Sequence, residues 1–108
     1  MKIQSVQDTG LWEAWIEFDE FDPSNFGTLY IIGEISIGKQ KARFIKLPQK
    51  SKNKTLHLMM PVQLSNSQYL VKEVLYSEAI ESIDKYNAVK IYAGQELIVS
   101  FDEIEIMI

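Results

Sequence analysis

Apolar and polar residues alternate with a period of two along much of this chain, most clearly between residues 11 and 37. Within Leu11–Phe18 the even-numbered residues are all apolar, whereas the odd-numbered ones include Glu13, Trp15 and Glu17. Because successive side chains of a strand point to opposite faces, this segment predicts a strand with one buried face and one mixed face. Its β-branched and aromatic content also favours a strand over a helix.

The following segment, Thr28–Ile37, is nearly all apolar, and over Leu29–Ile32 it is apolar on both faces. Such a pattern is typical of a central strand that is covered on both faces. Gly33 inside this segment predicts a β-bulge or a close backbone approach. The connection from Asp19 to Phe26 contains proline and asparagine and suits a turn. We therefore expect the two segments to form a hairpin on which the other strands assemble.

Alternation and turn residues predict further strands on both sides of this hairpin. Gly38-Lys39 and Gly94-Gln95 indicate tight turns. In the last apolar segment the parity switches after Phe101, which predicts a bulge near Asp102-Glu103, because one extra residue turns every later side chain to the opposite face. The further strands are predicted over Met1–Gln7, Gln40–Leu47, Lys54–Val62, Gln68–Tyr76, Ala88–Ala93 and Glu96–Ile108.

The segment Ser77–Tyr86 departs from the period of two. Ser77 suits a helix N-cap, and Glu78 and Glu81 suit a first helical turn. We therefore predict one short helix near residues 77–86. Together with about seven or eight short strands, this predicts a mainly β fold, either an antiparallel β-sandwich or a small β-barrel.

Composition limits the classes of protein to consider. The chain has 108 residues and no cysteine, so we expect a single domain over residues 1–108, without disulfides, thiolate chemistry or Cys-based metal sites. No apolar run approaches the ~18 residues of a membrane-spanning helix, and the opening MKIQSVQD lacks the apolar region of a signal peptide. We therefore expect a cytoplasmic protein with no membrane segment.

The net charge of −4 conceals a strong segregation of charge along the chain. Residues 1–34 carry a net charge of −6, residues 35–72 carry +8 with no acidic residue, and residues 73–108 carry −6. The acidic total disfavours nucleic-acid binding, and a single arginine is poor for bidentate phosphate contacts. The middle segment could instead bind the acidic segments of a second copy. Its basic patch consists of Lys39, Lys41, Arg43, Lys50, Lys52 and Lys54.

No catalytic or cofactor-binding constellation is visible. His57 is the only histidine, and a catalytic histidine needs an oriented partner that a sequence does not reveal. Glu13 and Glu17 flank Trp15, but four residues along a strand separate them by ~13 Å, beyond the ~5 to 9.5 Å used by glycosidases. There is no glycine-rich phosphate loop, nucleophile elbow or metal-binding motif, so we expect no cofactor and no metal.

The sequence therefore favours a small soluble, non-enzymatic β module that binds a protein partner or associates with itself as a homodimer. Trp15 and Tyr30 are the candidate anchors, because aromatic residues dominate interface energetics. An alternative is a ligand-binding barrel or small enzyme, with His57, Arg43 and Glu34 as polar contacts. A third alternative is single-stranded nucleic-acid binding through Lys39–Lys54.

Overall fold

The computed structural model describes residues 2–5, 12–21, 25–48, 54–65 and 71–107. These ranges contain β-strands and turns and no helix. None of them holds a helix of the length and hydropathy needed to cross a membrane. The described strands are β1 (Lys2–Ser5), β2 (Trp12–Phe18), β3 (Gly27–Ser36), β4 (Ile45–Lys46), β5 (Thr55–Met60), β6 (Val71–Ile80), β7 (Ala88–Ala93), β8 (Glu96–Glu103) and β9 (Glu105–Met107).

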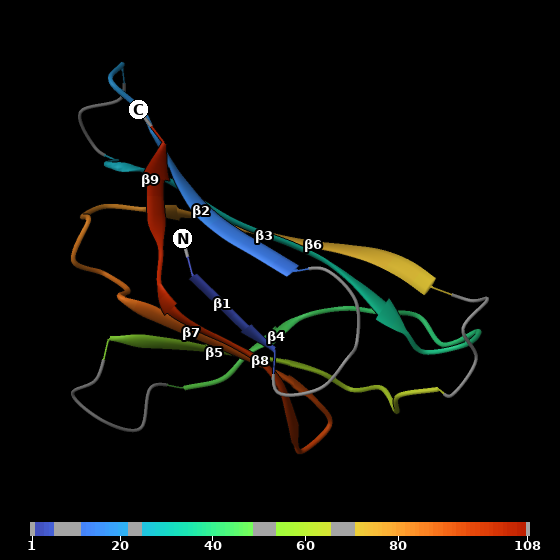
Figure 1. The fold of residues 1–108 in the computed structure, drawn as a ribbon. Coiled ribbons are helices and arrows are strands. Elements are labelled where there is room, and N and C mark those ends of the chain that lie inside the picture. Colours follow the sequence, from blue (N-terminus) through green and yellow to red (C-terminus); the bar gives the residue numbers. More distant parts are fainter. Residues whose placement is uncertain (1, 6–11, 22–24, 49–53, 66–70, 108) are drawn as a thin grey trace.

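The strands form two layers that face each other (Figure 1). A five-stranded sheet has the order β1-β8-β7-β5-β4, and a four-stranded sheet has the order β6-β3-β2-β9. The prediction of a mainly β fold is confirmed, and of the two predicted architectures, a sandwich and a small barrel, the sandwich is the one found. The sheets are mixed rather than purely antiparallel, because β5 pairs with β7 and β2 pairs with β9 in parallel.

The predicted hairpin is present as β2 and β3, with Trp12 opposite Gly33 and Phe18 opposite Gly27. The pairing of β3 with both neighbours shows no register shift at Gly33, so the bulge alternative is wrong there. Instead the buried indole of Trp12 lies directly against Gly33, where a Cβ atom would overlap the ring. Gly33 thus marks a close approach by a side chain rather than by backbone.

Strand β3 is central in its sheet, as predicted, but the described part of the chain covers only one of its faces. Its inward residues, such as Leu29 and Ile31, are fully buried against the other sheet. Tyr30 and Ile32 point the opposite way and are only half-buried. The prediction of cover on both faces is therefore wrong, because an apolar pattern alone does not reveal whether a second layer exists.

Several local predictions are confirmed. Strand β7 has the predicted bounds and is followed by the Gly94-Gln95 turn, in which Gly94 has φ of 59°. Gly38 likewise has a positive φ in the predicted Gly38-Lys39 turn. Strand β5 ends directly before Pro61. In contrast, the strand predicted over Gln40–Leu47 shrinks to the two residues of β4.

The helix predicted near residues 77–86 is wrong. Residues 77–80 continue β6, and Ala79 and Ile80 pair with the first residues of β3. Residues 81–87 form bends and turns. The N-cap and first-turn signals are local preferences of a few tenths to about 2 kcal/mol, and ten residues of pairing with β3 outweigh them.

The last segment is divided between the two sheets. Glu103 pairs with Lys2 while Phe101 pairs with Ile3, so the extra residue Asp102 forms an irregularity where the bulge was predicted. A second irregularity lies at Ile98, between the pairs Ile91–Val99 and Tyr92–Leu97. After Ile104 the chain crosses to the other layer as β9 (Figure 1). The single long strand predicted over Glu96–Ile108 is therefore two strands.

The core lies between the layers and consists of the inward residues of both sheets. Its largest fully buried side chains include Trp12, Phe101 and Met60, and the described residues contribute no buried polar or charged side chain to it. All polar chemistry of the described residues is therefore at the outer faces, in the loops or at the sandwich edges.

Candidate functional site

The outer face of the four-stranded sheet brings together the two predicted anchors. Trp15 and Tyr30 are cross-strand partners in β2 and β3. Their rings stack with centroids 5.5 Å apart and an interplanar angle of 23°, and both side chains are half-buried. The Trp15 Nε1 donates a hydrogen bond of 3.3 Å to the Glu17 carboxylate. The pair is therefore fixed in orientation while its outer surface stays open.

Apolar side chains extend this aromatic pair across the sheet. Ile32 lies beside it on β3, Leu75 lies opposite Ile32 on β6, and Met107 lies opposite Glu17 on β9. Leu75 is 60% exposed and Met107 is 50% exposed. Apolar side chains of this size and exposure, gathered on one face, mark an interaction surface more often than isolated ones do.

All charged residues described on this outer face are carboxylates. They come from every strand of the sheet: Glu13 and Glu17 from β2, Glu34 from β3, Glu73 from β6 and Glu105 from β9. We call the surface formed by these five glutamates with Trp15, Tyr30, Ile32, Leu75 and Met107 the acidic face.

The carboxylates of the acidic face are arranged unfavourably for the isolated chain. Glu34 and Glu73 are direct cross-strand partners, and like charges placed directly opposite destabilise a sheet. Within the described residues no cation pairs with either of them. The acidic face therefore has an electrostatic reason to bind a positively charged group.

Shallow hollows run across the acidic face. One of about 280 Å³ is lined by Trp15, Glu13, Glu105 and Met107. A second of about 180 Å³ is lined by Glu13, Ile32, Gly33, Glu34 and Glu73. Each hollow combines an apolar wall with at least two carboxylates, which suits a long side chain that has an aliphatic stem and a cationic head.

Basic residues lie beside the acidic face, at its β6 edge. Lys41, Arg43 and Lys72 line a hollow of about 460 Å³ together with Glu73 and Leu75. We call Lys39, Lys41, Arg43 and Lys72 the basic strip. Of the other residues of the predicted basic patch, Lys54 is exposed before β5, and Lys50 and Lys52 lie outside the described residues.

The loop that carries the basic strip is firmly held. The side-chain amide of Gln40 donates to the carbonyls of Ile37 and Gln63, and its oxygen accepts from the Gln63 amide. Lys72 donates to the carbonyl of Gln40. Phe44 packs against Tyr76 with ring centroids 5.7 Å apart. Lys39, Lys41 and Arg43 remain exposed.

His57 lies on the opposite side of the molecule, on the outer face of the five-stranded sheet. Its Nδ1 is 3.0 Å from the Tyr92 hydroxyl, and the two rings stack with centroids 5.9 Å apart. Both line an open hollow of about 520 Å³ with Leu47, Pro48 and Met59. His57, Arg43 and Glu34, predicted as polar contacts of one ligand, are therefore not brought together.

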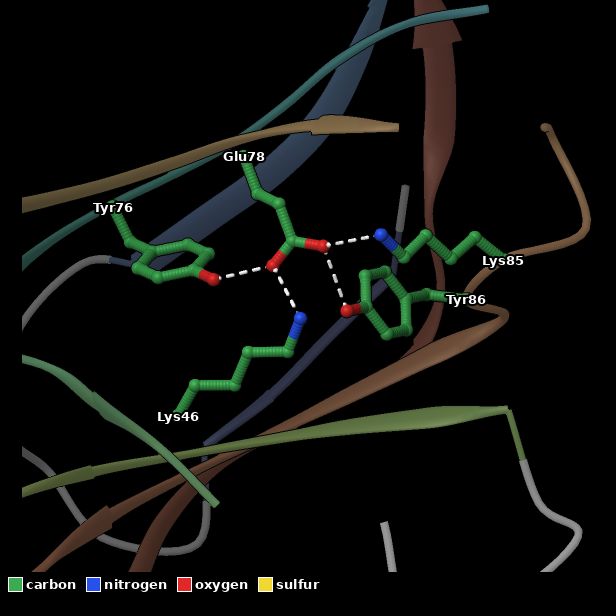
Figure 2. Close-up of polar contacts among 5 residues, drawn as sticks. All are labelled: Lys46, Tyr76, Glu78, Lys85 and Tyr86. Carbon is green, nitrogen blue, oxygen red and sulfur yellow. Dashed lines mark hydrogen bonds and ion pairs between the residues drawn. The ribbon is translucent and has the colours of Figure 1, made fainter. Parts of the chain in front are cut away.

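A polar cluster closes one edge of the sandwich around the carboxylate of Glu78 (Figure 2). One carboxylate oxygen accepts from the Tyr76 hydroxyl at 2.5 Å and from Lys46 Nζ at 3.0 Å. The other accepts from the Tyr86 hydroxyl at 2.7 Å and pairs with Lys85 Nζ at 3.1 Å. Figure 2 shows Lys46 reaching Glu78 from the opposite layer. The cluster therefore joins β6 to β4 and to the 81–87 turn.

These donors control the protonation of Glu78. Burial alone would raise its pKa, but the hydrogen bonds from both tyrosines and both lysines outweigh burial and lower the pKa to about 2. Burial and the Glu78 carboxylate raise the pKa of Tyr76. A carboxylate with four donors has no lone pair left for a substrate proton, so this cluster is built for structure rather than for acid–base chemistry.

Sequence reasoning missed part of the acidic face and the whole Glu78 cluster. The exposed Leu75 carried a signal, because it is apolar at the parity opposite to that of Val74 on β6. Met107 and Glu105 carried no signal, since the pairing of β9 with β2 is non-local. The Glu78 cluster was hidden because residues 77–86 resembled a helix.

In the described residues, no group of three or more His, Cys, Asp or Glu side chains is arranged to hold a metal ion. Comparisons of the chain with protein-family models, with curated proteins and with solved structures found no match. The described polar and apolar groups that could serve a function lie on the acidic face, in the basic strip, in the His57 hollow and in the Glu78 cluster.

Proposed function

We propose that this protein is a non-enzymatic interaction module that binds a cationic protein surface through its acidic face. One observation carries the proposal: a fixed Trp15–Tyr30 stack lies amid exposed apolar side chains on a face whose described charges are all negative. Tryptophan and tyrosine are the residue types most enriched among interface hot spots, together with arginine.

The chemistry of the face indicates what kind of side chain it binds. A guanidinium or ammonium group stacks favourably on tryptophan and tyrosine rings, with about 0.5 to 2 kcal/mol per contact. In the hollow beside Trp15, the carboxylate of Glu13 can receive such a cation, while Met107 contacts its aliphatic stem. Arginine is the best match, because it combines planar stacking with bidentate carboxylate pairing.

The remaining polar groups support binding rather than catalysis. The Glu78 carboxylate is saturated by four donors, and His57 lies on the other sheet with Tyr92 as its hydrogen-bond partner. Catalysis needs an acid or base within reach of a reacting group. Neither residue adjoins the hollows of the acidic face.

A synthetic peptide of alternating arginine and leucine tests this proposal, and a peptide of alternating glutamate and leucine is its control. We expect the arginine peptide to change the fluorescence of the half-buried Trp15 and to bind with Kd on the order of 10–100 μM at low salt, because stacking and charge pairing combine. The glutamate peptide should not bind. Trp15→Ala and Tyr30→Ala should each weaken binding about tenfold, measured by isothermal titration calorimetry.

The matched control is Glu81→Gln, which removes a carboxylate that is exposed on the 81–87 turn and away from the acidic face. Glu13→Gln should weaken the arginine peptide several-fold, whereas Glu81→Gln should leave its Kd unchanged. If both peptides bound equally, or if Trp15→Ala retained full affinity, the acidic face would not be the binding surface.

A further inference from the structure

We propose that the cationic partner of the acidic face is the basic strip of a second copy of this chain, in a two-fold dimer to which each copy contributes both surfaces. This inference rests on the proposed function of the acidic face and names its occupant. The dimer expected from the segregation of charge along the sequence thereby acquires defined contact surfaces.

The two surfaces adjoin each other within one molecule. Glu73 of β6 lines both the hollow of about 180 Å³ on the acidic face and the hollow of about 460 Å³ at the basic strip, and Leu75 lines the second of these. In a two-fold interface, each half of a surface contacts the other half of the same surface on the second copy. A surface that is acidic on one half and basic on the other is therefore complementary to itself. A two-fold axis near β6 would therefore create two equivalent contacts, each between the acidic face of one copy and the basic strip of the other.

Charge excludes the simpler arrangement in which two acidic faces meet. That dimer would place Glu13, Glu17, Glu34 and Glu73 of one copy against the same four carboxylates of the other. Juxtaposed like charges cost several kcal/mol at an interface. Pairing with the basic strip instead sets these four carboxylates against the four cations Lys39, Lys41, Arg43 and Lys72.

The basic strip has the form of a preorganised ligand. Lys41 and Arg43 are exposed at alternate positions, and Ala42 and Phe44 between and after them are half-buried. The Gln40 hydrogen bonds, the Lys72 contact and the Phe44–Tyr76 packing hold this segment without any strand pairing. A segment that is already ordered loses little conformational entropy on binding.

The size of the surfaces also favours combining them. Four strands about 4.8 Å apart, the longest about 33 Å long, give the acidic face an area on the order of 500 Å². A specific interface buries about 800 Å² per partner. The acidic face alone falls short of that area, and an interface that also includes the basic strip alongside β6 is larger.

The test is a charge exchange on the full chain, followed by size-exclusion chromatography with light scattering at about 50 μM and low salt. The wild type should elute with twice the 12.5 kDa mass of one chain and should dissociate as salt rises. The face-reversed variant E13K/E34K/E73K and the strip-reversed variant K39E/K41E/R43E should each be monomeric, since each carries two surfaces of like charge. Mixed in equal amounts, they should form a heterodimer.

Folding of each variant is checked by circular dichroism, and the milder variant E13Q/E34Q/E73Q, which removes charge without reversing it, should raise the dimer Kd about tenfold. The control E81K/D84K/D102K makes the same charge change outside the acidic face and should remain dimeric.

A folded pair of reversed variants that stays monomeric when mixed overturns the proposal, as does a monomeric wild type. If the wild type is monomeric yet binds the arginine–leucine peptide through Trp15, only the second copy is excluded; if it binds neither, the proposed function fails too.

Discussion

Gly33→Ala is expected to destabilise the fold by about 3 kcal/mol, a large share of the 5 to 15 kcal/mol typical of a whole domain. An added Cβ atom would overlap the six-membered ring of Trp12, which is only 1% exposed and packs in the core. The direction of this change in unfolding free energy is diagnostic, because Gly→Ala inside a regular strand normally stabilises a protein by about 0.5 to 1 kcal/mol. Thermal unfolding should show Tm lowered by roughly 10 °C or more.

A double-mutant cycle with Trp12→Phe separates the steric clash from other causes. The smaller phenyl ring leaves space above residue 33, so Gly33→Ala should cost less than about 1 kcal/mol in the Trp12→Phe background. Urea denaturation of the wild type, the two single variants and the double variant gives the coupling free energy between positions 12 and 33. An equal cost of Gly33→Ala in both backgrounds would show that contact with the indole is not the reason for glycine.

Acidification is expected to weaken the fold between about pH 4.5 and pH 2 through Glu78. The folded-state pKa of Glu78 is about 2, below its ordinary value of 4.5. A carboxyl group with a depressed pKa stabilises the fold fully above its unfolded-state pKa, and this contribution is lost as pH falls toward the folded-state value. Because the Glu78 side chain is 14% exposed, we expect a loss of about 2 kcal/mol rather than the ~3 kcal/mol of full linkage.

Glu78→Gln tests the source of this pH dependence. The variant should be about 2 kcal/mol less stable at pH 7 and should lose the corresponding decline in acid, because the amide carries no charge to titrate. Denaturant titrations at pH 7, 4 and 3 measure both effects. Glu81→Gln, three residues further along the chain and exposed, should behave like the wild type. An acid decline that persists unchanged in Glu78→Gln would assign it to other carboxylates.

The Glu78 cluster also explains why a helix is wrongly predicted over residues 77–86. Ser77, Glu78 and Glu81 carry helix-start preferences that act within one turn. In the fold, Glu78 occupies an inward position of β6, where Lys46 from the other sheet reaches its carboxylate. Lys46 is 32 residues distant in sequence, and no pattern within a short window reveals such a contact.

The acidic face could be predicted only in part from the sequence. Alternation placed Glu13, Trp15 and Glu17 on one face of β2, and the predicted hairpin brought Tyr30 into the same region. The stacking of Trp15 on Tyr30 required the actual register of β2 and β3. Leu75 and Met107 joined the face through pairings with β6 and β9 that are distant in sequence.

By itself, the sequence determined that the fold is mainly β, where β2, β3, β5 and β7 lie, and where the Gly38 and Gly94 turns lie, because backbone preferences and the period of two are local properties. Only the tertiary structure decided the strand order, the two parallel pairings, the division of the last segment between sheets and the separation of His57 from Glu34. These features depend on contacts between distant segments, whose free energy comes from burial and pairing across the whole fold. The same contacts collected glutamates from four strands into one acidic face and set the basic strip beside it.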